Sequence, residues 1–195
     1  MRQLLLATRN PHKTREFAEI LGEEFVVRDL SGETELLAVE ETGATFAENA
    51  ILKAVATSKQ LAGIVVADDS GLEVEALNGA PGVYSARYAG EAATDKQNVA
   101  KLLAELAALP HRRPYSARFR CVLALAHDGE VLGTAEGVVD GGIVDAPRGS
   151  GGFGYDPVFQ PAGSSRTFGE LSPGEKHQIS HRARAVQSLK ATLLS

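Results

Sequence analysis

The stretch SARFRCVLALAHDGEVLGTAEGVV, residues 116–139, is the part of the sequence that most directly predicts the fold. It contains two strand-like apolar runs separated by Asp128 and Gly129, a residue pair typical of a tight hairpin turn. Because further apolar runs alternate with helical patterns along the chain, the sequence predicts an α/β fold with a mixed β-sheet flanked by helices. The further strands are expected at residues 3–8, 25–30 and 63–71.

The expected helices begin at recognisable capping residues. A Ser, Thr or Asn whose side chain can accept a backbone N–H precedes the first four, in most cases with Glu or Gln three residues later. These helices are 11–21 after Asn10-Pro11, 46–61 after Thr45, 98–109 after Thr94, a further start at Ser172, and 179–194 at the end. Residues 71–90 and 147–159 are expected to be irregular, because Gly and Pro punctuate them.

Composition limits the classes of protein to which the chain can belong. Its 195 residues are 44% hydrophobic and contain no low-complexity segment, which fits a single domain over 1–195. The formal net charge of −5 argues against an extended nucleic-acid surface. No apolar run approaches the ~20 residues of a membrane span. Cys121 is the only cysteine, so we expect a cytoplasmic protein without an intramolecular disulfide.

The residues TRNPHK, 8–13, place polar side chains where an apolar run passes into a helix. Exposed backbone N–H groups at a helix N-terminus favour anions, and Lys13 is expected in the first turn. The segment therefore predicts either a site for an anionic ligand or an ordinary helix cap with a solvated lysine.

Asp68 and Asp69 end the apolar run of VVADDSG, 65–71, at the sheet edge where α/β proteins bind ligands. Adjacent carboxylates suit a hard cation such as Mg²⁺, although Asp-Asp-Ser-Gly is also good turn chemistry. Glu40 and Glu41 lie in an acidic loop and could complete a carboxylate set, since crowded like charges are tolerable only around a cation.

GSGGFG, residues 149–154, has the letters of a dinucleotide-binding fingerprint but does not follow a strand and open a helix. A Rossmann site is therefore not expected there. Its glycines would instead let the backbone approach a flat ligand, with Phe153 or Tyr155 available to stack on a base. GELSPGEK, 169–176, is not a phosphate loop, because Glu175 stands where that loop needs lysine.

His177 and His181 have a spacing that zinc sites use, but no cysteine or HExxH glutamate accompanies them, so a zinc pair is not expected. His181 and Arg182 are better suited to donate hydrogen bonds to carbonyl and ring-nitrogen acceptors, although Arg182 could equally be a solvated helix residue. Cys121 lies in a strand-like run and is expected to be buried and inert.

Six segments, in one order, resemble the inosine triphosphate pyrophosphatase family, whose members are also called XTP/dITP diphosphatases. They are LATRNPHK (6–13), EETGATFAENAILKA (40–54), ADDSGLEVEALNGAPGVYSARYAG (67–90), ARFRCVLAL (117–125), GGFGYDP (151–157) and EKHQISHRARA (175–185). The resemblance covers nearly the whole chain. It implies an elongated two-lobed α/β fold with a substrate cleft between the lobes, a homodimer and a requirement for Mg²⁺.

The resemblance also assigns roles to residues of this chain. It implies that Asp69 is the catalytic base and a metal ligand, and that Glu40, or alternatively its neighbour Glu41, is the second metal ligand, with Asp68 as a supporting carboxylate. The implied substrate contacts are Thr8, Arg9, Asn10, Pro11, His12 and Lys13 in a phosphate-binding loop, Lys53, Ser70 and Arg87, then Phe153, Gly154, Tyr155 and Asp156 at the base, and Lys176, His181 and Arg182. The run from Arg9 to His12 is bulkier and more basic than the small residues often seen there.

The implied reaction is hydrolysis of noncanonical purine nucleoside triphosphates (ITP, dITP and XTP) to a monophosphate and pyrophosphate. Lys13, Lys53, Lys176 and Mg²⁺ would neutralise the phosphates, and Asp69 would accept a proton from the water that attacks the α-phosphorus. Donors from His181, Arg182 or the backbone near 153–156 would satisfy a 6-oxo group and oppose the amino group of adenine. Two other hypotheses are a pyrophosphatase for modified pyrimidine nucleotides and a nucleotide-binding sensor without turnover.

Overall fold

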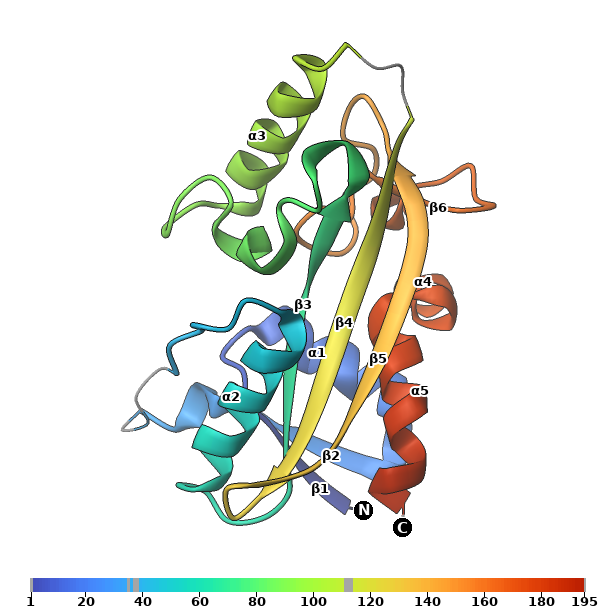
Figure 1. The fold of residues 1–195 in the computed structure, drawn as a ribbon. Helices are drawn as coiled ribbons and strands as arrows, with labels where there is room; N and C mark the ends of the chain where they lie inside the picture. The colour runs from blue at the N-terminus through green and yellow to red at the C-terminus, as the bar shows by residue number, and fades with distance from the viewer. Residues whose placement is uncertain (1, 35, 37–38, 111–113, 195) are drawn as a thin grey trace. The chain divides into compact units, whose positions relative to one another are not determined.

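The computed structural model describes residues 2–34, 36, 39–110 and 114–194 (Figure 1). Within them, six strands form one mixed sheet in the order β2-β1-β3-β4-β5-β6, which confirms the predicted α/β class. β1 pairs in parallel with β2 and β3, whereas β5 pairs with β6 in antiparallel fashion. The strands are β1 (Arg2–Leu6), β2 (Phe25–Arg28), β3 (Val65–Val74), β4 (Tyr115–His127), β5 (Glu130–Ile143) and β6 (Phe159–Pro161). The α-helices are α1 (Pro11–Leu21), α2 (Phe46–Ser58), α3 (Asp95–Ala107), α4 (Pro173–Ile179) and α5 (His181–Leu194).

The predicted hairpin is formed by β4 and β5. Asp128 and Gly129 at its turn have φ angles of 49° and 83°. Two successive positive φ angles are what a type I′ turn requires, and this turn matches the twist of the two strands that it joins. The amide of Gly129 donates to Ser58 Oγ at 3.0 Å, so the turn is also tied to the end of α2.

The predicted capping residues begin the helices. The Asn10 side chain accepts the His12 N–H at 2.9 Å. Thr45, Thr94 and Ser172 each form a capping box, in which the cap and the Glu or Gln three residues later satisfy each other's backbone N–H. These four helix starts were therefore predictable from local hydrogen-bonding chemistry alone.

Three local predictions were wrong. Residues 71–74 are not irregular but extend β3, because buried Leu72 and Val74 flank half-buried Glu73 with the period-two pattern of a strand. Phe159, at the end of the segment 147–159 that was expected to be irregular, instead begins strand β6, which pairs with the end of β5. The helix expected over 179–194 is interrupted at Ser180, whose ψ angle of 154° is extended, so that α4 and α5 are separate.

The chain divides into two compact units whose segments alternate along the sequence. Unit 1 comprises Met1–Asp69, Cys121–Gly137 and His181–Ser195, and unit 2 comprises Ser70–Arg120 and Val138–Ser180. β3, β4 and β5 each contribute residues to both units, and each unit has a hydrophobic core of its own. That the whole chain acts as one domain stays a prediction.

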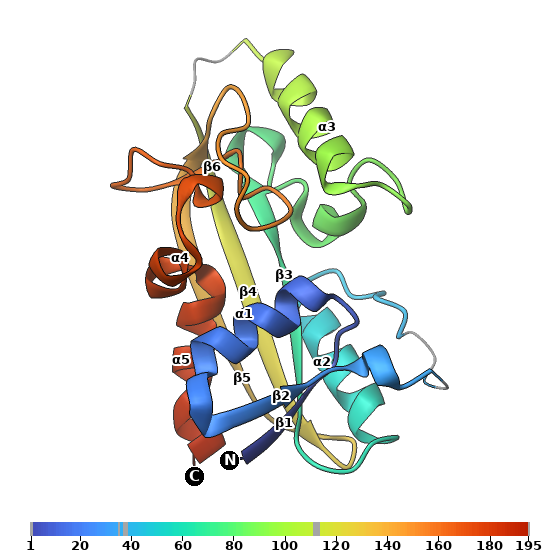
Figure 2. The same cartoon turned by 180° about the vertical axis from the view of Figure 1, so that it is seen from behind.

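The core of unit 1 lies between the sheet and the helices α1 and α5 (Figure 2). Val66 of β3 and Cys121 of β4 point to this side and pack with Phe17 of α1 and Val186 of α5. Because successive strand residues point to opposite faces, their neighbours Val65 and Ala67 are buried on the other side of the sheet, where α2 lies.

The core of unit 2 joins α3 to its part of the sheet. Leu102 of α3 belongs to the same buried cluster as Leu72 of β3. The cluster also holds three aromatic rings, with Phe159 centred 4.6 Å from Phe119 and 5.2 Å from Phe168. Edge-to-face and tilted rings at these distances contribute beyond simple area burial.

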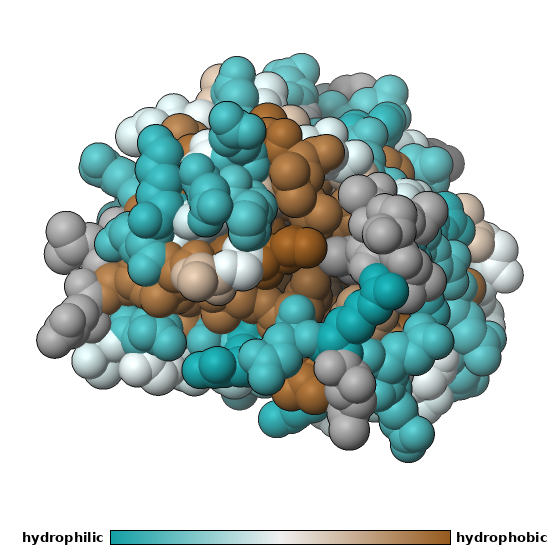
Figure 3. Space-filling model, turned by 90° about the horizontal axis from the view of Figure 1, so that it is seen from below, coloured by the Kyte–Doolittle hydropathy of each residue, from teal (hydrophilic) through white to brown (hydrophobic). Residues whose placement is uncertain are grey.

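Several large apolar side chains of unit 1 reach the surface. Val26, Ile64, Val131 and Leu132 are exposed, and Figure 3 shows apolar surface on the side of this unit that is seen from below. Exposed apolar side chains are common in folded proteins, so they indicate no particular partner. Among the described residues, no helix combines the length and the apolar character that crossing a membrane demands.

Candidate active site

Residues 8–13 form a turn that leads into the N-terminus of α1. Thr8 Oγ1 accepts the Asn10 N–H at 3.1 Å, and Asn10 Oδ1 in turn accepts the His12 N–H at 2.9 Å. Pro11 occupies the first turn of the helix, where a missing N–H costs nothing. These contacts fix the backbone and place Lys13 in the first turn, where its ammonium group forms a short ion pair with Asp68.

Asp68 is a fully buried carboxylate of unit 1 with three donors around it. Arg182 Nε lies 3.0 Å away, the Cys121 thiol lies 3.1 Å away, and Lys13 completes the set. Burial alone would raise the pKa of Asp68, but the charges of Arg182 and Lys13 outweigh it and hold this pKa well below its usual range. Asp68 is therefore ionised, and both of its oxygens are engaged by protein groups.

Arg182 has a second carboxylate partner, Glu16 of α1, with which it forms a short hydrogen bond. Arg182 is 1% exposed, and the two cations and two anions, Lys13, Arg182, Glu16 and Asp68, balance inside unit 1. The sequence predicted a base contact for Arg182, whereas its guanidinium donates to these two carboxylates. Glu16 was missed, although its position three residues after Lys13 places both on one helix face.

His181 is buried at the start of α5, next to Arg182. Strand β5 passes close to its backbone, because a Cβ atom on Gly137 would lie 2.1 Å from the His181 carbonyl oxygen. No other residue fits at position 137 without a backbone shift. Cys121 is buried as expected. Its burial, and to a smaller extent the nearby charge of Asp68, raises the pKa of its thiol well above the ordinary value.

Asp69 lies on the opposite face of β3 from Asp68 and contacts Lys53 of α2. Lys53 Nζ lies 2.9 Å from Asp69 Oδ1 and 2.7 Å from Glu41 Oε1, and it also donates to the Asp68 carbonyl oxygen at 2.9 Å. Burial raises the pKa of Asp69, and the charge of Lys53 offsets only part of this. Burial disfavours the Lys53 ammonium, but Asp69 and Glu41 outweigh it and raise the pKa of Lys53. Asp69 is therefore a stronger proton acceptor than an exposed aspartate.

The carboxylates of Asp69 and Glu41 fit a divalent cation. Asp69 Oδ2 is buried and has no hydrogen-bond partner among the described residues, and such an oxygen suits a hard cation. Glu41, the alternative ligand, shares Lys53 with Asp69, whereas Glu40 is exposed. The described part of the chain holds no group of three or more His, Cys, Asp or Glu that could bind a metal, so water and phosphate would have to supply the remaining ligands.

In unit 2, two of the predicted residues, Lys176 and Phe153, contact the carboxylate of Asp156. Its Oδ2 accepts from Lys176 Nζ at 2.6 Å and from the Phe153 N–H at 2.9 Å. The Lys176 side chain is almost completely buried, and its ammonium lies 5.3 Å from the centre of the Phe153 ring. A buried lysine is thus held by one carboxylate over an aromatic face, an arrangement favourable for a cation.

Gly152 and Gly154, in the glycine-rich segment 149–154, lie against other residues of this protein. Gly152 has a φ angle of +70°, and a Cβ atom there would lie 1.9 Å from Asp156 Oδ2. The neighbouring Gly154 donates its N–H to Asp95 Oδ2 at 2.7 Å. Tyr155 is buried in the core of unit 2, where its hydroxyl donates to the Ser85 carbonyl oxygen at 2.9 Å, so the prediction that its ring is available to stack on a base was wrong.

The remaining predicted residues, Ser70 and Arg87, also belong to unit 2. Ser70 follows Asp69 on β3 and is half-buried. Arg87 is half-buried, with its Nε 3.6 Å from Glu91 and its guanidinium 5.3 Å from the centre of the Tyr84 ring. In unit 1 the structure thus places Lys13 and Arg182 at Asp68, and Lys53 at Asp69 and Glu41. In unit 2 it places Phe153 and Lys176 at Asp156, with Ser70 and Arg87 elsewhere in that unit.

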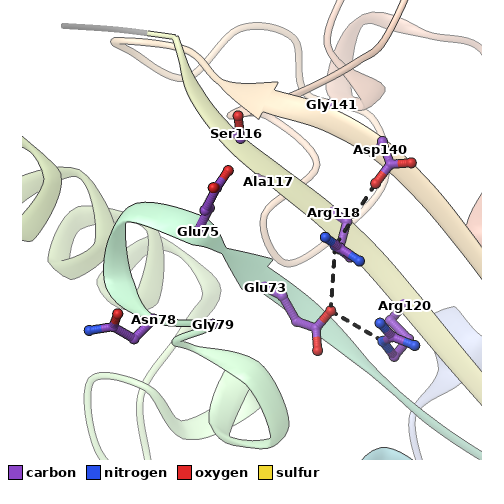
Figure 4. A pocket seen from close by; sticks show the side chains of 10 residues that line it. All are labelled: Glu73, Glu75, Asn78, Gly79, Ser116, Ala117, Arg118, Arg120, Asp140 and Gly141. Carbon is purple, nitrogen blue, oxygen red and sulfur yellow. Dashed lines mark hydrogen bonds and ion pairs between the residues drawn. The ribbon is translucent and has the colours of Figure 1, made fainter. Parts of the chain in front are cut away.

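A groove of about 580 Å³ lies on unit 2, along the face of the sheet that carries charged side chains (Figure 4). Arg120 Nε lies 3.1 Å from Glu73, and Arg118 Nε lies 3.9 Å from both Glu73 and Asp140. Cross-strand ion pairs of this kind are usual on a sheet face that meets solvent. None of the predicted site residues lines the groove.

Comparisons with known proteins agree along the whole chain. A family model described as the Ham1 family matches residues 4–192. A dITP/XTP pyrophosphatase of Geobacillus kaustophilus is 51% identical over 190 residues, covering 97% of this chain and 93% of that protein. One of Bacillus subtilis is 48% identical over 196 residues, covering 99% and 98%. The solved Ham1 protein of Staphylococcus aureus superposes with a TM-score of 0.84 at 44% identity, covering 98% of both chains, and that of Coxiella burnetii with 0.87 at 43%, covering 100% and 99%.

Proposed function

Because the chain belongs to the Ham1 family, we propose that it hydrolyses ITP, dITP and XTP to the nucleoside monophosphate and pyrophosphate, which removes these noncanonical purine nucleotides from the pool. It is an enzyme of the nucleoside-triphosphate pyrophosphatase class, as the curated relatives are, and the resemblance noted in its sequence is confirmed. The observation that carries the proposal is Asp69, a buried carboxylate of raised proton affinity that is held by Lys53.

The residues of unit 1 account for phosphate binding and proton transfer. A nucleoside triphosphate carries about four negative charges, which Lys13 and Lys53 would partly neutralise. Asp69 would accept a proton from water as that water attacks the α-phosphorus. The bond between the α-phosphorus and its bridging oxygen would then break, and pyrophosphate would leave.

Asp69 and Glu41 are the residues that would hold Mg²⁺. A bound Mg²⁺ supplies charge stabilisation at the phosphoryl oxygens, which two lysines alone do not complete. Lys53 contacts both carboxylates and keeps them close together, since two anions would otherwise repel each other. The lysine therefore orients the two carboxylates as well as contributing charge.

For recognition of the base, the residues of unit 2 are the better candidates. Lys176, whose ammonium carries three donors, suits a 6-oxo purine, and Phe153 offers an aromatic face. The same donors would oppose the 6-amino group of adenine, and each unpaired buried polar group costs about 1–3 kcal/mol. Two such mismatches would give roughly a hundredfold discrimination or more. His181 stays a predicted contact, whereas Arg182 is committed to carboxylates of unit 1.

The deciding experiment incubates the protein with Mg²⁺ and, separately, dITP, XTP, dATP, dGTP and a modified pyrimidine triphosphate. We expect pyrophosphate as the direct product, with dITP and XTP turned over fastest. Release of orthophosphate as the first product, or equal turnover of dATP, would contradict the proposal. Preference for the pyrimidine would favour the pyrimidine hypothesis, and tight binding without any turnover would favour a sensor.

We also propose a homodimer in the cytoplasm, which rests on the family resemblance and on the single cysteine. Sedimentation at micromolar concentration is expected to give twice the mass of the 20.6 kDa chain. A monomer under these conditions would remove this part of the proposal.

A further inference from the structure

Arg9 lies inside the turn of residues 8–13, but its side chain contacts another loop. Arg9 Nη2 donates to the carbonyl oxygen of Leu36 at 2.7 Å and to that of Glu33 at 3.1 Å, 27 and 24 residues further along the chain. A guanidinium group can serve two carbonyl oxygens at once because its donors lie in a rigid plane. Arg9 therefore connects the turn before α1 to the loop that follows β2.

Two further contacts join the same two segments. The Leu30 N–H donates to the Thr8 carbonyl oxygen at 2.9 Å. Thr14 Oγ1 donates to Asp29 Oδ2 at 2.6 Å. The beginning of the loop after β2 is thus attached to the turn at Thr8 and to α1, and the Arg9 contacts extend this attachment to Leu36.

The loop leads directly to the candidate metal ligand. Glu41 lies five residues after Leu36, and five residues of chain span at most about 17 Å. At its far end Glu41 is held by Lys53, which also holds Asp69. Leu36 therefore contacts Arg9, and Glu41, five residues later in the sequence, contacts Lys53.

We infer that Arg9 is a positioning residue that holds the loop carrying Glu40 and Glu41 beside the turn that carries Lys13. The inference rests on the proposed function, because it takes Glu41 as a ligand for Mg²⁺. Without the Arg9 side chain, the loop loses its two hydrogen bonds at Leu36 and Glu33, while the contacts at Leu30 and Asp29 remain. Glu41 then samples more positions, and ordering it on metal binding costs more conformational entropy.

The first test needs neither metal nor nucleotide. Amide hydrogen exchange is compared for the wild type, Arg9→Ala and Arg15→Ala, a matched control that removes an exposed arginine of α1. We expect Arg9→Ala to speed exchange at residues 33–34 and 39–45 by roughly three- to tenfold, which is the loss of one to two ordinary hydrogen bonds, with α3 and β4 unchanged. Arg15→Ala should match the wild type. Unchanged exchange in the loop of Arg9→Ala would overturn the inference.

The second test measures the Mg²⁺ concentration that gives half-maximal hydrolysis of dITP. We expect Arg9→Ala to raise it by roughly fivefold, more than it lowers kcat, and Arg9→Lys to recover part of the shift because its ammonium still donates. A fall in kcat with an unchanged Mg²⁺ requirement would also overturn the inference. Because hydrogen exchange reports on the loop whatever the substrate, absence of dITP hydrolysis in the wild type would refute the proposed function without deciding the role of Arg9.

Discussion

Replacing Arg182 with methionine is expected to destabilise unit 1 strongly. The guanidinium is 1% exposed and donates to Asp68 and Glu16, whose side chains are also buried. Methionine fills similar space without the charge, so Glu16 and Asp68 would both lose the Arg182 guanidinium, while Lys13 and the Cys121 thiol still contact Asp68. Breaking a buried pair by removing one partner costs about 3–5 kcal/mol, since a charge is left uncompensated.

The assay is urea unfolding followed by far-ultraviolet circular dichroism at pH 7. Arg184→Met, which removes an exposed arginine of the same helix, is the matched control and is expected to stay within about 0.5 kcal/mol of the wild type. In the double variant with Glu16→Gln, the loss should be smaller than the sum of the two single losses, because one charge of the broken pair is gone.

A loss below about 1 kcal/mol for Arg182→Met would refute the account of a buried, balanced charge cluster, because a desolvated carboxylate cannot be left unpaired so cheaply. Strict additivity with Glu16→Gln would refute it as well. Either result would favour the role that the sequence predicted for Arg182, which is contact with the base. In that role, its removal would affect turnover of dITP and leave the free energy of unfolding nearly unchanged.

The remaining predictions concern three other side chains. Asp69→Asn should lower hydrolysis of dITP by roughly a hundredfold or more while the variant still binds the triphosphate, and near-normal turnover would exclude Asp69 as the base. Lys176→Met should reduce the preference for dITP over dATP, measured as kcat/KM, by roughly tenfold, and an unchanged ratio would exclude Lys176 from base recognition. Contacts with Arg166 and Ser172 lower the pKa of Glu175 from 4.5 to about 2, so its stabilising contribution is complete above pH 4.5 and is lost as the pH falls toward about 2. The difference in Tm between the wild type and Glu175→Gln should therefore shrink across this window, and a constant difference would contradict it.

The elements that the sequence predicted well are those determined by local chemistry. The caps at Asn10, Thr45 and Thr94 and the turn at Asp128-Gly129 depend on hydrogen bonds and φ angles within a few residues. β6 was missed because a strand of three residues is too short for a periodic pattern, and it exists only because the end of β5 offers a pairing edge. The division into two units likewise depends on contacts between distant segments, which no local pattern reveals.

The sequence named candidate site residues but not the partners that the structure gives them. Lys13 and the two aspartates were singled out as charged residues at the ends of apolar runs, and Lys53 by the family resemblance alone. That Arg182 pairs with Glu16, 166 residues away, requires the packing of α5 against α1. That Glu41 contacts Lys53 likewise depends on how its loop meets α2.

The contrast between Asp68 and Asp69 shows why side-chain direction decides function here. Adjacent residues on a strand point to opposite faces, so Asp68 enters the side of the sheet covered by α1 and α5, while Asp69 enters the side of α2. On the first side, Arg182 and Lys13 outweigh burial and lower the pKa of Asp68. On the second side, burial outweighs the charge of Lys53, and the pKa of Asp69 rises. One carboxylate is therefore fixed as a structural anion and the other stays available to take a proton, which is why we expect substitution of Asp68 to affect stability first and substitution of Asp69 to affect chemistry first.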